Sequence, residues 1–223
     1  SFDGSELAVG GIGNSFTVSY TQTFDFDGSN WNQTFQTIYE ESLGDCSGIN
    51  VEFSSNTNIL AIGSCYNDGN GTDAGHVRVF ENNFGYWNQI GQDIDGENSS
   101  DNSGEEISLS SDGNIVAIGA RFNDGNGFSS GHVRVFKNIL GSWMQIGQDI
   151  DGEAAYDYSS YSVSLNNTGN LLSIGSGFND GNGNNSGHIR LFSLTPPCSD
   201  VGCIDPLALN FDPYATVDDS SCV

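Results

Sequence analysis

The sequence predicts an all-β protein, a β-propeller built from four-stranded antiparallel blades of about 56 residues, with a ring that is incomplete within this chain. Three observations predict this fold. Hydrophobic residues alternate with a period of about two in short runs between turn signals. Thirty glycines occur against four prolines, and no window of the body combines helical periodicity with capping residues. Landmarks also recur at one constant interval, namely Ile62, Ile118 and Ile174, each followed by Gly, and His76, His132 and His188.

Each copy of the repeat contains four expected strands. In the third copy they span residues 107–110, 115–119, 131–136 and 143–150. The turn at 111–114, Ser-Asp-Gly-Asn, joins the first two strands as a tight hairpin. The Gly-rich run 123–127 joins the second and third.

The two ends of the chain differ from the middle. Residues 1–195 hold four copies of the repeat, of which the first and last are incomplete, and the last stops after its third strand. All four prolines and three of the five cysteines follow residue 195. Residues 196–223 therefore form a separate Cys/Pro/Asp-rich module, which is too short for its own core and needs a disulfide, a metal ion or the blades to hold it.

The charge balance excludes several partners. Acidic residues outnumber Lys and Arg 29 to 5, which gives a formal net charge of −24. Binding to nucleic acid or to an anionic membrane surface requires clustered basic residues. No apolar run approaches the roughly 18 residues of a membrane span. We expect neither nucleic acid nor membrane insertion.

The repeat resembles the FG-GAP repeats of integrin alpha-subunit propellers and of many secreted microbial proteins. The resemblance rests on the run 112–120, Asp-Gly-Asn-Ile-Val-Ala-Ile-Gly-Ala, followed by a Gly-rich loop and by 131–136, Gly-His-Val-Arg-Val-Phe. It implies an extracellular propeller used in binding or adhesion. The family's calcium loop falls on 54–57, 110–113 and 166–169, where most of the acids are missing, so that site is not carried over. Residues 202–222 are similar to Cys-bounded, Asp-rich modules of secreted surface proteins from marine microbes.

The cysteines indicate an oxidising compartment. Cys46 and Cys65 lie nearly opposite each other across the hairpin centred near residue 56, and neither recurs in the other copies, so we expect a disulfide between them. Two unrelated buried thiols are the alternative. Cys203 and Cys222 bracket the C-terminal module as a second expected pair. Cys198 is left unpaired or pairs with another chain. These pairs predict an extracellular or cell-surface location.

The repeated histidines and arginines have a structural interpretation. Histidines separated by one repeat length occupy the same position in successive blades and do not converge on one site. His76, Arg78 and Phe80 share one strand face. We expect the repeated arginines to pair with repeated carboxylates or to stack on Trp87 and Trp143. Examples of such carboxylates are Asp93, Asp95, Asp149 and Asp151.

Calcium is the one cofactor that the sequence suggests. The repeated Asn-Asp-Gly-Asn-Gly loops offer hard oxygen ligands, although the same residues also make good turns without an ion. The C-terminal module offers four carboxylates and little apolar content. The candidate ligands are Asp68, Asn70, Asp124, Asn126, Asp180 and Asn182 in the loops, and Asp205, Asp212, Asp218 and Asp219 in the module.

The last expected strand lacks a partner. No fourth strand follows the third strand of the final copy, which leaves an open edge at His188, Ile189, Arg190, Leu191 and Phe192. An open apolar edge is a pairing site. A preceding segment of the same polypeptide could cover it, or a second copy could complete the strand and build an oligomer or fibre.

Taken together, these features predict a secreted, non-catalytic propeller that acts in extracellular binding, adhesion or assembly of a surface structure. Its partner would be an extracellular protein, a glycan or further copies of itself. The sequence contains no nucleophile elbow, His-x-x-x-His pair, phosphate loop or dinucleotide fingerprint, so no catalytic residues are predicted. The alternative is a carbohydrate-active enzyme, a lyase or glycosidase, with a carboxylate site on the propeller axis.

Overall fold

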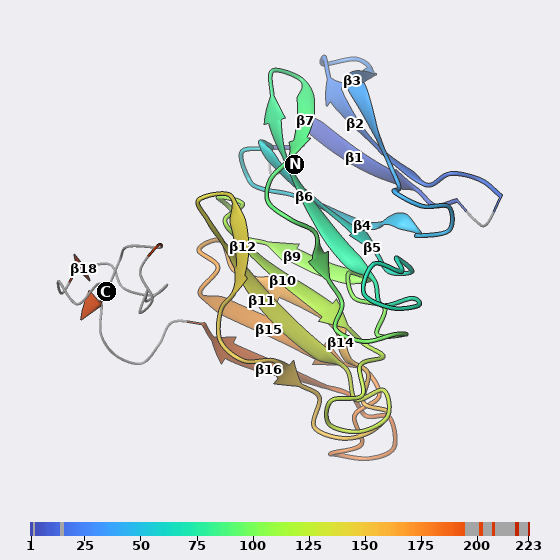
Figure 1. The fold of residues 1–223 in the computed structure, drawn as a ribbon, viewed down its shortest axis with the longest axis vertical. Coiled ribbons are helices and arrows are strands. Elements are labelled where there is room, and N and C mark those ends of the chain that lie inside the picture. The colour runs from blue at the N-terminus through green and yellow to red at the C-terminus, as the bar shows by residue number, and fades with distance from the viewer. Residues whose placement is uncertain (2, 14–15, 195–200, 203–206, 208–216, 219–222) are drawn as a thin grey trace.

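The computed structural model describes residues 1, 3–13, 16–194, 201–202, 207, 217–218 and 223. The regular secondary structure of these residues consists of β-strands alone. The strands form antiparallel sheets that follow one another in chain order (Figure 1). A short parallel pair, β17 (Val201–Gly202) and β18 (Val217–Asp218), is the exception. The prediction of an all-β fold is confirmed.

Each sheet corresponds to one copy of the repeat. The first contains β1 (Glu6–Gly11), β2 (Tyr20–Phe26) and β3 (Trp31–Tyr39). The second contains β4 (Ser47–Phe53), β5 (Ile59–Ser64), β6 (His76–Asn83), β7 (Tyr86–Gln89) and β8 (Ile94–Asp95). The third contains β9 (Glu106–Leu109), β10 (Ile115–Ala120), β11 (His132–Ile139), β12 (Ser142–Gln145) and β13 (Ile150–Asp151). The fourth contains β14 (Ser159–Leu165), β15 (Leu171–Ser176) and β16 (His188–Ser193).

The fourth strand of a full copy differs from the expectation. The predicted single strand 143–150 is two strands, β12 and β13, and both pair with β11. Gly147 between them has a φ of 77°, a conformation that glycine adopts without steric cost. The backbone therefore leaves the ladder after Ile146, whose N–H still donates to Val135 O at 2.8 Å, and rejoins it at Ile150.

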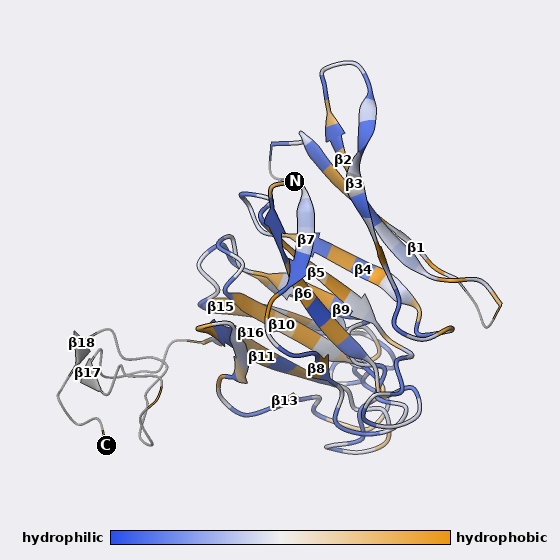
Figure 2. Ribbon diagram, turned by 45° about the horizontal axis from the view of Figure 1, so that its top comes forward, coloured by the Kyte–Doolittle hydropathy of each residue, from blue (hydrophilic) through white to orange (hydrophobic). Residues whose placement is uncertain are grey.

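Three apolar cores lie between successive sheets. Leu60 and Ile62 of β5 pack with Ile38 of the first sheet, whereas Ala61, between them, packs with Ile107 and Ile118 of the third. The third and fourth sheets enclose a further core. This alternation buries both faces of each middle sheet, and the apolar positions accordingly concentrate on the strands (Figure 2).

The repeated Ile-Gly pair has a packing reason. A Cβ atom on Gly63 would lie 1.9 Å from the carbonyl oxygen of Gly104, which leads into the next sheet. Gly10 makes an equally close approach to Gly48 O. At each of these positions the backbone that enters the next sheet lies so close that only a glycine fits.

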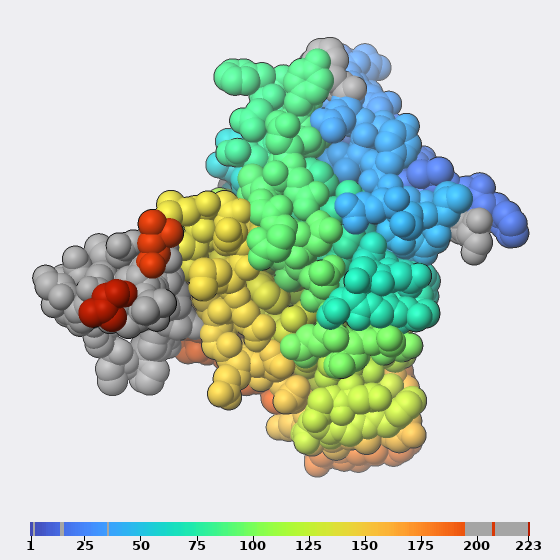
Figure 3. Space-filling model, in the orientation of Figure 1, coloured from blue at the N-terminus to red at the C-terminus, as the bar shows by residue number. Residues whose placement is uncertain are grey.

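The sheets do not close into a ring in this structure. They stack in chain order, as the bands of colour from blue to orange show (Figure 3). The fourth sheet leaves Ile189 and Leu191 exposed, and the first sheet leaves Leu7 and Val9 exposed. The described residues contain no helix long and apolar enough to cross a bilayer. Because the sheets do not close, the prediction of a propeller is not confirmed.

Candidate functional site

An ion pair lies where β9 begins beside the end of β10. Glu105 immediately precedes β9 and Arg121 immediately follows β10, and the antiparallel register that pairs Glu106 with Gly119 brings the two side chains together. Arg121 Nη2 donates to Glu105 Oε1 at 2.7 Å. The other carboxylate oxygen, Glu105 Oε2, is buried and has no hydrogen-bond partner among the described residues. This carboxylate therefore has one oxygen bonded to Arg121 and one buried oxygen whose hydrogen-bonding capacity is unused.

A second carboxylate lies beside the first. Burial raises the pKa of Glu106, and the negative charge of Glu105 raises it further. Asn50 of the second sheet donates its Nδ2–H to Glu106 Oε2 at 3.4 Å. Burial also raises the pKa of Glu105, but the Arg121 guanidinium opposes that rise. The pKa values of both carboxyls are therefore raised by burial, and the Arg121 guanidinium opposes the rise at each of them.

A hollow walled by aromatic rings adjoins the ion pair. It has a volume of about 350 Å³ and is lined by Arg121, Phe122, Tyr158, Tyr161 and Phe178. The Phe122 and Tyr158 rings meet edge to face at 5.8 Å between centroids, and Tyr158 meets Phe178 at 5.3 Å. The Arg121 guanidinium carbon lies 4.8 Å from the Phe122 centroid.

The lining comes from three segments of the chain. Arg121 and Phe122 follow β10, Tyr158 and Tyr161 lie at the start of β14, and Phe178 follows β15. Tyr161 is 50% exposed and Phe178 41% exposed, so a ligand can reach both rings. A mainly apolar hollow with one charged pair at its edge has the composition of a small-molecule site.

The repeated arginines connect each sheet to the segment that precedes it. Arg78, Arg134 and Arg190 each donate to a backbone carbonyl that precedes their sheet, Tyr39 O, Asp95 O and Asp151 O respectively. Arg78 and Arg134 also lie 3.6 and 3.7 Å from Glu41 and Glu97. Each guanidinium lies over the Phe two residues further along its own strand. We expected the aspartate side chains or Trp87 and Trp143 as partners. Glu41 and Glu97 are repeated carboxylates, as expected, but they are not the named aspartates, and the other contacts are with backbone carbonyls and Phe rings.

Hydrogen bonds hold each Asn-Asp-Gly-Asn-Gly loop internally and to neighbouring segments of the chain. Asn67 Nδ2 donates to Asp45 Oδ2 at 3.0 Å, and Asp68 Oδ1 accepts from Asp73 N at 2.9 Å. Asn70 Nδ2 donates to the carbonyl of Gly96 at 2.8 Å. The copies containing Asp124, Asn126 and Asp180 make the matching local bonds, and Asn182 N donates to Ser186 Oγ. These hydrogen bonds fix the loops without an ion, both locally and to segments 22 to 26 residues away. A calcium ion at the loops stays a prediction.

Cys46 and Cys65 are adjacent but not bonded. Both are free, buried thiols in hydrogen-bonding contact, not the disulfide that we expected. The predicted proximity holds because Ser47 pairs with Ser64 after a bulge in the β4–β5 ladder. Burial raises the pKa of both thiols. A protonated thiol is a poor nucleophile, which disfavours disulfide formation.

The remaining predicted sites are partly visible. The edge strand β16 contains His188, Ile189, Arg190, Leu191 and Phe192, and Ile189 and Leu191 are 74% and 68% exposed. Pairing of this edge with another strand stays a prediction. Asp218 lies in β18. Cys198, Cys203, Cys222, Asp205, Asp212 and Asp219 lie outside the described residues.

Our reading of the sequence missed the hollow and its ion pair. Tyr66, Phe122 and Phe178 recur at the repeat interval, a signal that could have been noticed. Arg121, Glu105 and Tyr158 do not recur, and Tyr158 reaches Phe122 only because the fourth sheet packs against the third.

Comparison with known proteins finds 67 solved chains that match the structure. No protein-family model and no curated protein matches the chain, so the FG-GAP resemblance gains no support. A solved structure of a provisionally named 6-phosphogluconolactonase from Bacteroides uniformis is similar, with 14% identity and a TM-score of 0.48 over 74% of this chain. A second, from Bacteroides fragilis, has 15% identity and a TM-score of 0.43 over 63% of this chain. The chain covers only 46% and 38% of these structures.

These neighbours correct the functional prediction. Both descriptions name an enzyme, whereas we expected a non-catalytic module for adhesion or assembly. That expectation is wrong as it stands, and the neighbours agree better with its alternative, a carbohydrate-active enzyme. At these identities and TM-scores the likeness carries no argument about this chain's chemistry, which has to come from its own residues.

Proposed function

We propose that this chain is a carbohydrate-active enzyme that cleaves a glycosidic bond at the aromatic hollow. One observation carries the proposal. The Glu105 carboxylate has one oxygen on Arg121 and a second, buried oxygen without a partner, next to a hollow lined by Phe122, Tyr158, Tyr161 and Phe178.

The hollow suits a sugar ring. Aromatic faces carry partial negative charge and attract the weakly positive C–H groups of a pyranose face. Arg121 supplies hydrogen-bond donors to hydroxyl groups, and Glu105 Oε2 supplies an acceptor. The net charge of −24 favours a neutral substrate over an anionic one.

The two carboxylates fit the two tasks of hydrolysis. In the proposed reaction, protonated Glu106 gives its proton to the departing glycosidic oxygen as the C–O bond breaks. Ionised Glu105 takes a proton from the water whose oxygen bonds to the anomeric carbon. The direct ion pair of Arg121 with Glu105 supports the ionised role of Glu105, and the raised pKa of Glu106 is compatible with a proton donor.

The test is a hydrolysis screen with neutral polysaccharides and aryl glycosides. On a substrate that is cleaved, Glu105→Gln and Glu106→Gln should each lower kcat by a factor of about 10² or more. Phe178→Ala should raise KM by a factor of about 2 to 10, since a ring contact contributes roughly 0.5–1.5 kcal/mol. Glu81→Gln, an exposed carboxylate on β6, is the control that removes the same charge away from the hollow.

Two results would contradict the proposal. One is turnover that survives both glutamine substitutions while the variants remain folded. The other is the absence of any bound or cleaved neutral sugar across the screen. Cleavage of uronic-acid polymers only, with an unsaturated product, would replace hydrolysis by a lyase reaction at the same hollow.

A further inference from the structure

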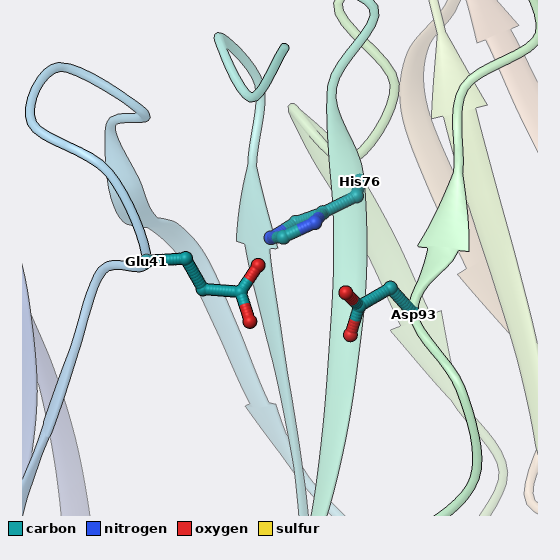
Figure 4. A group of neighbouring side chains, drawn as sticks. All are labelled: Glu41, His76 and Asp93. Carbon is teal, nitrogen blue, oxygen red and sulfur yellow. The ribbon is translucent and has the colours of Figure 1, made fainter. Parts of the chain in front are cut away.

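A histidine and two carboxylates converge at the junction of the first and second sheets. Glu41 comes from the segment between β3 and β4, His76 is the first residue of β6, and Asp93 lies between β7 and β8. Their potential ligand atoms all lie within 4.8 Å of one another. The imidazole ring lies between the two carboxylates, and both carboxylates point toward it (Figure 4).

His76 has an unexplained nitrogen. The side chain is 1% exposed, and its Nε2 atom has no hydrogen-bond partner among the described residues. A buried polar atom without a partner costs free energy, so native proteins seldom leave one unsatisfied. In a neutral imidazole one ring nitrogen keeps a lone pair that can bind a ligand.

The surrounding groups hold the carboxylates in place. Gln89 Nε2 donates to Asp93 Oδ1 at 2.6 Å, which fixes that carboxylate and leaves its other oxygen free of this bond. Arg78 lies 3.6 Å from Glu41 and reduces the local negative charge. Its guanidinium is anchored elsewhere, on Tyr39 O at 2.8 Å and over the Phe80 ring.

The same arrangement recurs one repeat later. Glu97, His132 and Asp149 also place their potential ligand atoms within 4.8 Å of one another. His132 is 1% exposed, and Gln145 Nε2 donates to Asp149 Oδ1 at 2.7 Å. The third repeat has only the first two groups. His188 Nδ1 lies 3.5 Å from Glu153, and no third acid completes a group among the described residues.

We propose that Glu41–His76–Asp93 and Glu97–His132–Asp149 are two equivalent sites for a divalent transition metal, for which Zn²⁺ is the probe. An imidazole nitrogen with two carboxylate oxygens suits Zn²⁺ or Mn²⁺ better than Ca²⁺, which takes oxygen ligands. Three protein ligands leave a coordination position for water. Because Glu41 and Glu97 precede the sheet that supplies the other two ligands, each ion would tie a sheet to the segment that enters it.

The test counts bound Zn²⁺ on the full chain after chelation and dialysis, by calorimetry and native mass spectrometry. His76→Gln and His132→Gln should each remove one tight site, and the double variant should remove two. Asp93→Asn and Asp149→Asn should lower the affinity of the same sites without changing a fully buried residue. His188→Gln is the matched control, because the described residues supply no second acid to its group, and it should leave the count unchanged.

The difference in bound Zn²⁺ between the wild type and each variant separates these sites from thiols and other acids, because the variants keep those groups. Zn²⁺ should raise the thermal midpoint of the wild type more than that of the double variant, because an ion bound only to the folded state stabilises it. Equal Zn²⁺ counts in the wild type and the folded double variant would overturn the proposal. So would a loss of one site on His188→Gln alone. Neither result bears on sugar cleavage at the aromatic hollow.

Discussion

Glu52 provides the sharpest test of the electrostatics at the sheet junctions. It lies on β4 in the second sheet, and its Oε2 accepts a hydrogen bond from Leu109 N of the third sheet at 2.9 Å. Burial raises the pKa of Glu52 from 4.5 to about 7 in the folded chain. The folded state therefore binds this proton more tightly than the unfolded state. The stabilisation is complete below pH 4.5 and is lost as the pH rises from about 4.5 to about 7.

The magnitude follows from the two pKa values. Their difference of about 2.5 corresponds to roughly 3 kcal/mol, and partial solvation of the carboxylate reduces this to about 2 kcal/mol. Glu52→Gln keeps an oxygen for Leu109 N but cannot ionise. It should therefore stabilise the fold by about 2 kcal/mol at pH 8 and change stability little at pH 4.5.

The assay is urea unfolding of both proteins at pH 4.5, 6 and 8. Comparing wild type with Glu52→Gln at each pH cancels the titration of every other group that the substitution leaves unperturbed. A stability difference that stays constant between pH 4.5 and 8 would refute the reasoning, because it would show that Glu52 is not desolvated. A difference of the opposite sign at pH 8 would show that the ionised carboxylate stabilises the junction.

Two further predictions concern the contacts between sheets. Gly63→Ala places a Cβ 1.9 Å from the backbone oxygen of Gly104 and should lower the unfolding free energy by about 1–3 kcal/mol, measured by urea titration. Gly177→Ala, whose Cβ would have its nearest contact at 3.7 Å, should lower the unfolding free energy less in the same titration. Asn123→Ala removes a buried hydrogen bond of 2.9 Å to Asp101 Oδ2 and should cost about 1–3 kcal/mol, measured as a lower thermal midpoint, and an unchanged midpoint would contradict the role assigned to that loop.

The parts of the fold that depend on short-range pattern could be predicted from the sequence. The hairpin between β9 and β10 lies where the turn 111–114 places it, and the expected strand at 115–119 is β10. The proximity of Cys46 and Cys65 was also predictable, since it follows from the register of one hairpin. The division of the fourth strand at Gly147 was not, because nothing local distinguishes a bulge from an ordinary glycine in a strand.

The candidate site was harder to predict, because its residues come from different sheets. Tyr158 and Phe178 meet Phe122 only after the fourth sheet packs on the third. The partner of Arg121 depended on which of the many acids of this chain the β9–β10 register brings near it. Two of the repeated arginines pair with repeated carboxylates, but the particular acids named from the sequence were wrong for a similar reason. Their contacts cross to the segment entering the sheet, a distance of 39 residues along the chain.

The relation of each site to the repeat separates structural roles from catalytic ones. A group that recurs from one copy to the next, such as Glu41 with His76 and Glu97 with His132, meets a need that every junction between sheets shares. A single active site requires the opposite, a position where one copy departs from the others. Arg121 replaces the Cys65 and Gly177 of the neighbouring copies, and Glu105 replaces their Ile49 and Tyr161. These departures coincide in the third and fourth copies, and there they form the only described ion pair in which an Arg lies at the edge of an aromatic hollow. A repeat fold gains chemistry by such local breaks in its symmetry, while the repeated residues preserve its stacking.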